Sequence, residues 1–362
     1  MKNQYASTTL TINLAAIAEN YNILKSNCSK NCLVSSVVKA NAYGLGVDAV
    51  ASRLAKEGCN IFFVANLDEA VELRGILTEA QIFVLHGLTE GQEEAFVNYE
   101  IIPVLNSSYQ VDLWKQYSII KQKKLSCALH FDTGMNRLGL RFSNYLEVGK
   151  DFSDYFDIKY IMSHLACADD KSHQLNREQL NEYQAIKSHF KGIKLSIANS
   201  SAIFLGEDYH FDMVRPGIAL YGGNPAPYIA NPMKNVINLT SKILQIEQVD
   251  RASTIGYGAS HKLKLGMKIA TIAAGYADGY LRSLSNVGIC AVGGVIVPVI
   301  GRVSMDIVTL DVTNVPDPHL KIGAEVELIG DNIPVDIIAG KAGTIAYEIL
   351  TSLGSRYKKV YI

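Results

Sequence analysis

The chain has 362 residues, 48% of them apolar and 19% charged, and its formal net charge is −1. This length allows two domains with a sizeable core, and a near-neutral charge without a basic block argues against nucleic acid as a partner. No run approaches the roughly 20 apolar residues of a membrane span, and the N-terminus lacks the apolar core of a signal peptide. We therefore expect a cytoplasmic protein that binds no membrane. Its six cysteines contain no CxxC pair, which favours reduced thiols over a structural metal.

Short apolar runs alternate with stretches of helical period from an expected N-terminal strand, residues 8–12, to about residue 222. Eight strands that alternate with helices predict a (β/α)8 barrel of the TIM type, although a doubly wound open sheet has the same alternation. The predicted strands cover residues 33–38, 61–65, 82–85, 101–105, 125–131, 158–162, 194–198 and 217–220, and the predicted helices include 48–56, 67–77, 90–98, 108–122 and 173–190.

The character of the sequence changes over residues 222–235, where glycine and proline cluster. Beyond this region the chain is rich in Ile, Val and Thr, and turns with Gly or Asp separate its apolar runs. We predict an α/β chain in which the barrel occupies residues 1–230 and a C-terminal, mostly β-strand domain occupies residues 231–362. The strands predicted for this second domain are 239–249, 267–273, 289–300, 304–311 and 325–329.

Polar side chains follow most of the predicted barrel strands. Active sites of such barrels lie at the carboxyl ends of the strands, so these residues are expected around one cavity mouth. Lys39 ends the first strand, where loss of hydration lowers the pKa of an amine and makes it a competent nucleophile. The alternative is a lysine whose stem is buried and whose amine reaches solvent. The other strand ends carry Asn66, His86, Asn106, His130, Asp132, Arg137, His164 and residues 199–201.

Two segments have the features of a phosphate-binding cradle. Asn199, Ser200 and Ser201 follow the seventh predicted strand and offer hydroxyls and backbone amides, although a simple helix cap has the same residues. Residues 215–218 read RPGI before the eighth predicted strand, and a glycine there lets a phosphate approach its amide closely. A strand-end lysine together with such a cradle is what pyridoxal 5′-phosphate needs, because the lysine holds its aldehyde and the cradle holds its phosphate.

Residues 38–46 read VKANAYGLG and resemble the cofactor-lysine segment of bacterial alanine racemases. Residues 132–139, DTGMNRLG, and residues 214–222, VRPGIALYG, are similar to further segments of that family, in the same order. The resemblance extends over about residues 8–360. The remaining matching segments are SHL at 163–165, GYG at 256–258, AGYADG at 274–279 and GRVSMD at 301–306.

The resemblance implies a racemase that interconverts L-alanine and D-alanine, supplies D-alanine for peptidoglycan and works as a homodimer without a metal. Lys39 would carry the cofactor covalently and act as the base for D-alanine, while Tyr257 of the partner subunit would be the base on the opposite face. A tyrosine base needs help at neutral pH, and the resemblance places His164 and Arg215 beside it. The further cofactor contacts that it implies are Tyr43, Asn199, Ser200, Gly217, Ile218 and Tyr347.

The resemblance also implies roles in binding the substrate and the cofactor ring. Arg137 would contact the substrate carboxylate and the phenolic oxygen of the cofactor, which suits a planar fork of donors. Arg215 would face the pyridine nitrogen, and an arginine there can only donate, so the nitrogen should stay unprotonated. Met305 of the partner subunit would reach the substrate carboxylate through its backbone, and Tyr276 and Asp306 would line the entrance. For Tyr276, Tyr347 and Met305, the alternative is a core or interface role.

His130 departs from the family pattern. Many members have a lysine at this position that is carbamylated and orients the arginine that corresponds to Arg137. Alternation along strand 125–131 points His130 toward the barrel mouth. We expect a neutral imidazole with a lowered pKa that accepts a hydrogen bond from Arg137, with an anion such as chloride as a source of the missing charge. A histidine that is bonded to a backbone carbonyl is the alternative.

Two other functions share much of this sequence pattern. A racemase of broader or different amino-acid specificity would have the same motifs, because the pocket that decides specificity is not readable from the sequence. A non-catalytic barrel that binds pyridoxal phosphate would lack the C-terminal domain, so the segment around Tyr257 argues against it. No motif matches the longer decarboxylases of the same barrel family.

Overall fold

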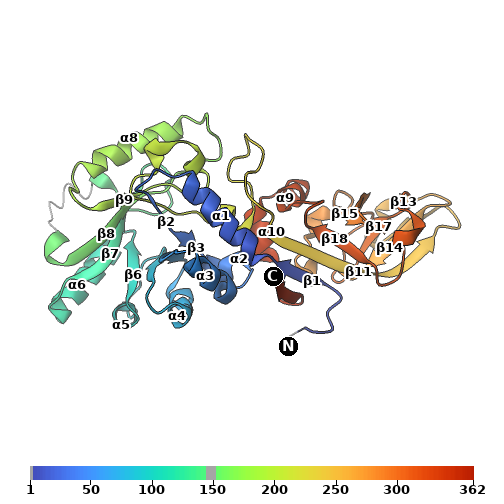
Figure 1. Cartoon of the computed structure of the whole chain (residues 1–362), viewed down its shortest axis with the longest axis horizontal. Helices are drawn as coiled ribbons and strands as arrows, with labels where there is room; N and C mark the ends of the chain where they lie inside the picture. The colour runs from blue at the N-terminus through green and yellow to red at the C-terminus, as the bar shows by residue number, and fades with distance from the viewer. Residues whose placement is uncertain (1–2, 144–151) are drawn as a thin grey trace.

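The computed structural model of the chain describes residues 3–143 and 152–362. It shows a rounded N-terminal body in which strands alternate with helices and an elongated C-terminal body rich in strands (Figure 1). The predicted fold class, an α/β barrel followed by a mostly β-strand domain, is confirmed. None of the helices in the described ranges combines the length and the hydropathy that crossing a bilayer requires.

Parallel strands form the barrel at the centre of the N-terminal body. A seven-stranded sheet runs from β3 to β9, and β10 pairs with β2, which continues into β3 after Ser35. The N–H group of Arg215 donates to the carbonyl of Ala198 at 2.9 Å, which joins the chain after β10 to the chain after β9 and closes the ring. The strands are β2 (Leu33–Val34), β3 (Ser36–Val37), β4 (Ile61–Val64), β5 (Gln81–Val84), β6 (Ile101–Leu105), β7 (Leu125–His130), β8 (Phe156–Met162), β9 (Lys194–Ser196) and β10 (Met213–Val214).

Helices between the strands cover the outside of the barrel (Figure 1). Their apolar residues recur at helical spacing, as in α3, which buries Val47, Val50 and Leu54. Asn66 and Ser107 cap α4 and α6, because each side chain accepts from a backbone N–H group in the first turn. The helices are α1 (Leu14–Ser26), α2 (Lys39–Tyr43), α3 (Val47–Lys56), α4 (Leu67–Ile76), α5 (Glu93–Asn98), α6 (Ser108–Lys121) and α8 (Leu175–Lys187).

The eighth barrel strand lies earlier in the chain than the sequence predicted. Residues 217–220 were expected to form it, but Ile218–Tyr221 is a 3-10 helix, η4, and the strand is Met213–Val214. A short apolar run that is buried throughout does not distinguish a strand from a helical turn. The correction moves Arg215 from the entry of the strand to its carboxyl end, on the same rim of the barrel as Lys39.

The C-terminal body is organised around β11, a strand of 12 residues that runs along most of its length (Figure 1). Strand β1, from the N-terminus, is antiparallel to β11 and parallel to β19, so it adds to this sheet, although the sequence placed it within the barrel domain of residues 1–230. The division of the chain after residue 230 otherwise stays a prediction. The strands are β1 (Thr9–Ile12), β11 (Ile237–Gln248), β12 (Ser253–Ile255), β13 (His261–Leu263), β14 (Lys268–Ile272), β15 (Ile289–Val292), β16 (Val295–Pro298), β17 (Val308–Asp311), β18 (Glu325–Ile329) and β19 (Lys358–Tyr361).

Turns interrupt two of the strands predicted for this body. The predicted strand 289–300 is a hairpin of β15 and β16. Within 304–311 only β17 is extended, and a turn precedes it in which the N–H group of Ser304 donates to the carbonyl of Ile307 at 3.1 Å. The elements that the sequence analysis missed are the hairpin of β12 and β13, strand β19, and the helices α9 (Val335–Ala342) and α10 (Ala346–Ser352).

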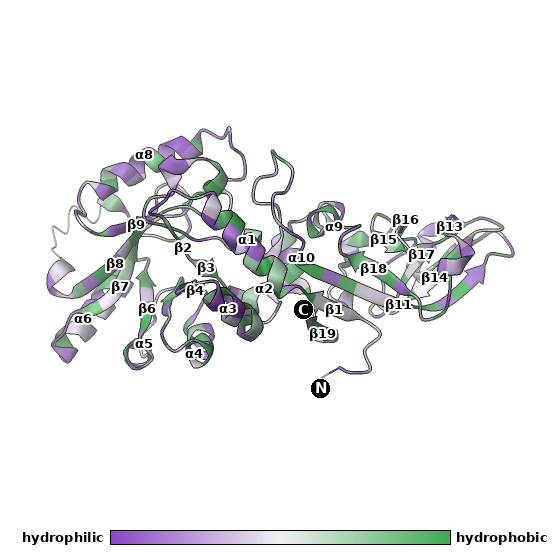
Figure 2. Ribbon diagram, in the orientation of Figure 1, coloured by the Kyte–Doolittle hydropathy of each residue, from purple (hydrophilic) through white to green (hydrophobic). Residues whose placement is uncertain are grey.

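One hydrophobic core extends from the barrel into the main C-terminal sheet. The barrel strands are apolar along most of their length, whereas the covering helices are apolar in part and polar in part (Figure 2). Helix α10 packs against α2, next to the strand end that carries Lys39. The shared core therefore brings one C-terminal helix to the mouth of the barrel.

Candidate active site

A cavity of about 380 Å³ opens at the carboxyl ends of the barrel strands. Its walls come from segments far apart in the sequence, which converge at this rim as expected for such a barrel. The predicted site residues in the cavity lining are Lys39, Tyr43, His86, Asn106, His130, Arg137, His164, Asn199, Ser200, Arg215, Gly217 and Tyr347.

Lys39 comes shortly after β3, and its side chain lines the cavity. Burial lowers the pKa of its amine, the guanidinium of Arg137 lowers it further, and the carboxylate of Glu69 acts in the opposite direction. This amine therefore loses its proton more readily than one in water does. A nucleophile or a base at neutral pH needs this property.

The backbone after Lys39 makes a single left-handed turn. Residues 40–43 all have φ between 53° and 55°, a region that costs residues with a Cβ roughly 1–2 kcal/mol each. Asn41 offsets part of this strain, because its Oδ1 accepts from the N–H group of Val47 at 2.7 Å and caps the start of α3. The turn ends at Tyr43, whose side chain lines the same cavity as Lys39.

Glu69 fixes the backbone next to Lys39, and the sequence analysis missed it. Its carboxylate accepts from the N–H group of Ala40 at 2.8 Å and from the N–H group of Ala65, directly after β4, at 2.7 Å. One carboxylate therefore joins the ends of two neighbouring strands. Glu69 lies in the first turn of α4, where acidic residues are common for helix stability alone, so nothing in the sequence distinguished it.

Another wall of the cavity has a hydroxyl and backbone amides at the start of η4. Ser200 Oγ accepts from the N–H groups of Gly217 at 2.9 Å and Ala219 at 3.3 Å. A Cβ at residue 217 would collide with the hydroxyl oxygen of Tyr43, so the space between these groups requires glycine. The rings of Tyr43 and Tyr347 lie 5.9 Å apart. The two N–H groups are used by Ser200, so the hydroxyl groups of Ser200 and Tyr43 are the donors that border a space which a side chain would fill.

The structure places two other predicted cofactor contacts around this wall. Asn199 lines the cavity, and its Oδ1 accepts from the N–H group of Ala202 at 3.0 Å. It thereby caps the short 3-10 helix Ala202–Phe204, as the helix-cap alternative from the sequence proposed. The side chain of Ile218 is buried and does not line the cavity. The predicted cofactor contact of this residue therefore concerns its backbone N–H group.

Arg215 is a buried cation that has no carboxylate partner among the described residues. Its Nη1 donates to Ser196 Oγ at 2.5 Å, and its Nη2 donates to the Ser163 carbonyl at 2.6 Å. Burial lowers the pKa of the guanidinium to about 10. Nη2 also lies 3.4 Å from His164 Nδ1, which must be the acceptor because an arginine only donates. Burial and the charge of Arg215 hold the pKa of His164 well below its usual range, so this imidazole is neutral.

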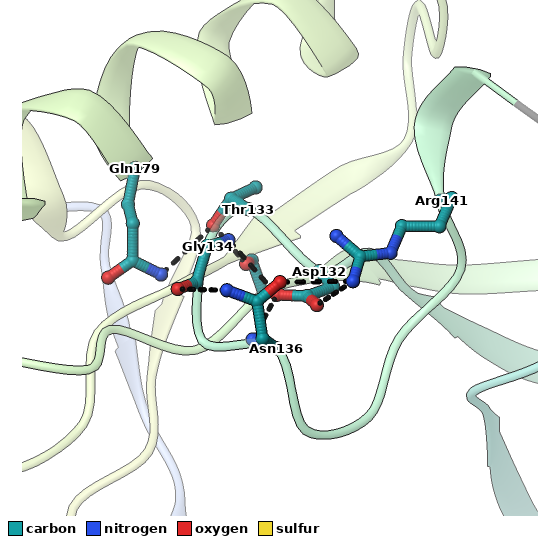
Figure 3. Close-up of polar contacts among 7 residues, drawn as sticks. Asp132, Thr133, Gly134, Asn136, Arg141 and Gln179 are labelled. Carbon is teal, nitrogen blue, oxygen red and sulfur yellow. Dashed lines mark hydrogen bonds and ion pairs between the residues drawn. The ribbon is translucent and has the colours of Figure 1, made fainter.

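The loop that carries Arg137 is folded around Asp132 (Figure 3). Oδ1 of Asp132 accepts from the N–H groups of Gly134 and Asn136, each at 3.0 Å. Burial opposes ionisation of this carboxyl, but these donors and the nearby Arg141 outweigh it and lower the pKa. The side chain of Arg137 lines the cavity and has neither an ion pair nor a hydrogen bond within the described residues. It is therefore free to bind an anion.

Asn106, at the end of β6, fixes the orientation of His130. The amide nitrogen of Asn106 donates to the carbonyls of Leu85 at 3.0 Å and Val104 at 2.7 Å, which leaves its Oδ1 to face His130 Nδ1 at 2.7 Å. Nδ1 of His130 must therefore carry the proton, and Nε2 is left as an acceptor.

The neutral imidazole with a lowered pKa that the sequence predicted is confirmed. Burial, the charge of Arg215 and then that of Arg137 lower the pKa of His130 to about 4, against the opposing charge of Asp132. The acceptor for Nδ1 is the side chain of Asn106, where one interpretation of the sequence expected a backbone carbonyl. The expected hydrogen bond from Arg137 is not formed within the described residues, although Nε2 is left as an acceptor for it. Strand alternation predicted the direction of the side chain, whereas the partner on a neighbouring strand depended on tertiary packing.

Four predicted site residues lie outside the cavity, on the C-terminal body. The side chain of Tyr257 is 73% exposed, that of Met305 is 53% exposed and that of Tyr276 is 43% exposed. Tyr257 lies between β12 and β13, at the end of this body that is remote from the barrel (Figure 1). The N–H group of Tyr276 donates to the Ser304 carbonyl at 3.0 Å, which joins two of the turns. We call Tyr257, Tyr276, Met305 and Asp306 the C-terminal turn face.

Family models match most of the chain. Residues 12–225 match the model described as alanine racemase, N-terminal domain, and residues 236–361 match alanine racemase, C-terminal domain. The chain is 44% identical to the alanine racemase of Rhodospirillum rubrum, over 98% of this chain and 96% of the relative. It is 42% identical to the biosynthetic alanine racemase of Agrobacterium fabrum, over 99% of this chain and 95% of the relative.

Solved structures have the same fold over both bodies. The alanine racemase of Bartonella henselae, with covalently bound pyridoxal phosphate, matches with a TM-score of 0.94 and 39% identity, over 98% of this chain and 99% of that chain. The biosynthetic alanine racemase of Pseudomonas aeruginosa matches with a TM-score of 0.90 and 30% identity, over 100% of both chains. The chain therefore belongs to the alanine racemase family.

Proposed function

We propose that the protein is a pyridoxal 5′-phosphate-dependent alanine racemase, which interconverts L-alanine and D-alanine and supplies D-alanine for peptidoglycan. The observation that carries the proposal is a single cavity whose walls contain the amine of Lys39 and the donors around Gly217. Membership in the family, with relatives described as alanine racemases over nearly the whole chain, supports the same substrate and reaction.

The residues of the cavity fit this cofactor. The space beside Gly217, bordered by Ser200 Oγ, the Tyr43 hydroxyl and backbone amides, suits a phosphate group. The amine of Lys39, whose pKa is lowered by burial, suits an aldehyde. When bound, the cofactor withdraws electrons from the Cα–H bond of an attached amino acid and makes that proton removable.

Lys39 has two tasks in this proposal. It would hold the cofactor covalently, and its free amine would serve as the base that exchanges the Cα proton of D-alanine. Its lowered pKa keeps a share of the amine unprotonated near neutral pH. Glu69 holds the backbone beside Lys39, so the amine stays at the strand end in both tasks.

Arg215 is proposed to face the ring nitrogen of the cofactor. Its guanidinium is already held by Ser163 and Ser196, so its orientation does not depend on the ligand. Because it only donates, it keeps that nitrogen unprotonated and moderates the electron withdrawal by the ring. Neutral His164 lies beside it and adds no second positive charge.

Arg137 is proposed to bind the substrate carboxylate. Its guanidinium lines the cavity and has no partner within the described residues, while the Asp132 loop fixes its backbone. Nε2 of His130 is left as an acceptor by the bond to Asn106, so we assign His130 the role of orienting Arg137. In this chain a neutral imidazole would then replace the carbamylated lysine of many relatives.

The second base is proposed to come from another copy of the chain. Racemisation needs a proton acceptor and a proton donor on opposite faces of Cα. Tyr257 is exposed and does not line the cavity of its own chain, so Tyr257 of the partner subunit would complete the site in a head-to-tail homodimer. Met305 of the partner subunit would then contact the substrate carboxylate, with Tyr276 and Asp306 at the entrance.

The cysteines support a cytoplasmic location. All six are free, and three of them, Cys59, Cys127 and Cys290, are buried. Free thiols in such number are typical of proteins in a reducing compartment.

Turnover of L-alanine by the purified protein tests the proposed function. We expect D-alanine to form, and we expect a yellow protein whose cofactor is fixed by borohydride to the peptide that contains Lys39. Serine and lysine as substrates test the alternative of a broader specificity. A yellow protein without turnover would support the non-catalytic barrel instead, and labelling of another lysine would contradict the assignment of Lys39.

A further inference from the structure

Gln179 is a completely buried amide in α8 that bonds to two neighbouring segments of the barrel rim. Its Oε1 accepts from the N–H group of Ala166 at 2.9 Å, and its Nε2 donates to the His164 carbonyl at 2.9 Å and to Thr133 Oγ1 at 3.2 Å. A carbonyl only accepts and an N–H group only donates, so these partners fix the orientation of the amide. Gln179 therefore joins the chain after β8 to the chain after β7.

The segment after β7 is the loop that carries Arg137. Thr133 belongs to this loop, and Figure 3 shows the Gln179 amide directed at its hydroxyl. The backbone of Gly134 lies against the same side chain, since a Cβ on Gly134 would come within 3.4 Å of Gln179 Cγ. The hydrogen bonds of Asp132 lie within the loop and fix its shape. Gln179 is a contact from outside, which holds the loop against α8.

The segment after β8 holds His164 and bonds to Arg215. The residue before the histidine, Ser163, accepts from Arg215 Nη2 through its carbonyl at 2.6 Å. The hydroxyl of Ser163 lies 2.8 Å from Thr133 Oγ1, the same atom that accepts from Gln179. A continuous set of buried hydrogen bonds thus connects the loop after β7 with the groups that hold the guanidinium of Arg215, and such networks fix their members in one geometry.

Two other residues join neighbouring strand ends in a similar way, and the chemistry of each matches its partners. Glu69 accepts from two N–H groups, for which a carboxylate is sufficient. Gln110 Oε1 accepts from the N–H group of Asn106 at 2.8 Å, and its Nε2 donates to the His86 carbonyl at 2.8 Å. Gln179 likewise faces both an N–H group and a carbonyl, so its position requires an amide. A carboxylate there would place two acceptors against each other.

We propose that Gln179 is a positioning residue for Arg137, whose loop it fixes relative to His164 and Arg215. The inference rests on the proposed function, in which Arg137 binds the substrate carboxylate. Gln179 does not line the cavity, so it acts through the loop and not by contact with a ligand. Without its two donated bonds, the loop is held less precisely and the carboxylate binds less tightly. The amine of Lys39 is held by separate contacts at β3 and β4, so proton transfer should change little.

Gln179→Met tests the proposal in the cofactor-loaded enzyme, because it keeps the size of the side chain and removes its hydrogen bonds. We expect KM for both enantiomers of alanine to rise about tenfold, kcat to fall by less than about threefold, and the absorbance of the bound cofactor to stay unchanged. Gln184→Met, at an exposed position of the same helix, is the matched control. Thr133→Val removes only the hydroxyl that Gln179 contacts and should raise KM by about threefold. This milder variant keeps the test valid where the methionine variant does not fold.

Arg137→Ala, alone and combined with Gln179→Met, separates positioning from a general loss of structure. The single variant should raise KM strongly, and the second change should then add no further increase, because Gln179 acts through Arg137. An unchanged KM in folded Gln179→Met and Thr133→Val would overturn the inference, and so would an equal rise in KM with and without Arg137. An unchanged KM in Arg137→Ala would instead contradict the proposed carboxylate site itself, and the inference with it.

Discussion

The barrel mouth and the C-terminal turn face differ in how completely one chain builds them. At the barrel mouth, Arg215 is buried and held by neighbouring side-chain and backbone groups, and Glu69 ties down the backbone beside Lys39. On the C-terminal turn face, Tyr257 and Met305 are largely exposed. A single chain therefore builds the barrel-mouth part of the proposed site and exposes the residues that the proposed homodimer would add to the barrel mouth of a second chain.

The C-terminal turn face is exposed, but hydrogen bonds and ion pairs hold its turns in place. The N–H group of Ala277 donates to the Met305 carbonyl at 3.0 Å, so two turns support each other. Arg356 lies 3.2 Å from the carboxylate of buried Asp278 and 2.7 Å from that of Asp306, and links both turns to the C-terminal segment. Residues that are rigid and exposed together are suited to docking into another surface.

The largest effect is expected from Lys39→Ala, which removes the reactive amine of the barrel mouth. Turnover in both directions should fall by about 10³-fold or more, because in the proposed mechanism this residue both holds the cofactor and moves a proton. Absorbance of the bound cofactor and racemisation rates measure the two losses. Lys56→Ala, at an exposed position at the end of α3, is the matched control and should change neither. Substantial residual turnover would show that another base can serve this face.

Tyr257→Phe removes the hydroxyl that the turn face would supply. Proton abstraction from L-alanine should fall by about 10²-fold, with a much smaller loss for abstraction from D-alanine, because only one face of Cα loses its base. Exchange of the Cα proton with deuterated water, followed for each enantiomer, measures the asymmetry. Tyr99→Phe, an exposed tyrosine on the barrel, is the control. Equal losses for both enantiomers would mean that the two faces are misassigned.

Glu69→Gln weakens the hydrogen bonds that hold the backbone beside Lys39, without removing a reacting group. The loss of charge-assisted bonds to two N–H groups should reduce the free energy of unfolding by about 2 kcal/mol. Turnover should fall by roughly tenfold, because the amine is held less precisely. Removing this negative charge should also lower the pKa of Lys39 further. Asp68→Asn, in the same helical turn, is the control. Identical behaviour of the two variants would contradict the role of Glu69 in holding the backbone beside Lys39.

His130 is expected to have the smallest effect on the rate. His130→Ala should raise KM for alanine several-fold with little change in kcat, because Arg137 is oriented less well. The folded-state pKa of about 4 lies below the usual 6.5, so the unfolded chain binds more protons between these values and stability falls as the pH falls through them. We expect the free energy of unfolding, measured with denaturant at several pH values, to fall less steeply with decreasing pH in His130→Gln than in the wild type or in His173→Gln. Unchanged kcat, KM and pH dependence would contradict this role.

The sequence predicted the barrel and most of its rim because each strand is an apolar run that ends in a polar residue. Lys39 and the loop of Arg137 could be found in this way, and strand alternation predicted the direction of the His130 side chain. The eighth strand was misplaced, because an apolar run of four residues fits a buried 3-10 helix equally well. The partners of these residues were not predictable, since Asn106 and Glu69 act through contacts between neighbouring strand ends. Their side chains reach groups that lie far from them in the sequence.

Mixing two inactive variants tests the central claim most directly. In a heterodimer of Lys39→Ala and Tyr257→Phe chains, one of the two sites has both Lys39 and Tyr257 of the partner subunit. Random exchange between the chains should therefore restore about one quarter of the wild-type activity. Differently tagged chains that purify together establish that exchange has occurred. Activity no higher than that of the separate variants, with exchange established, would contradict a site that is shared between two copies of this chain.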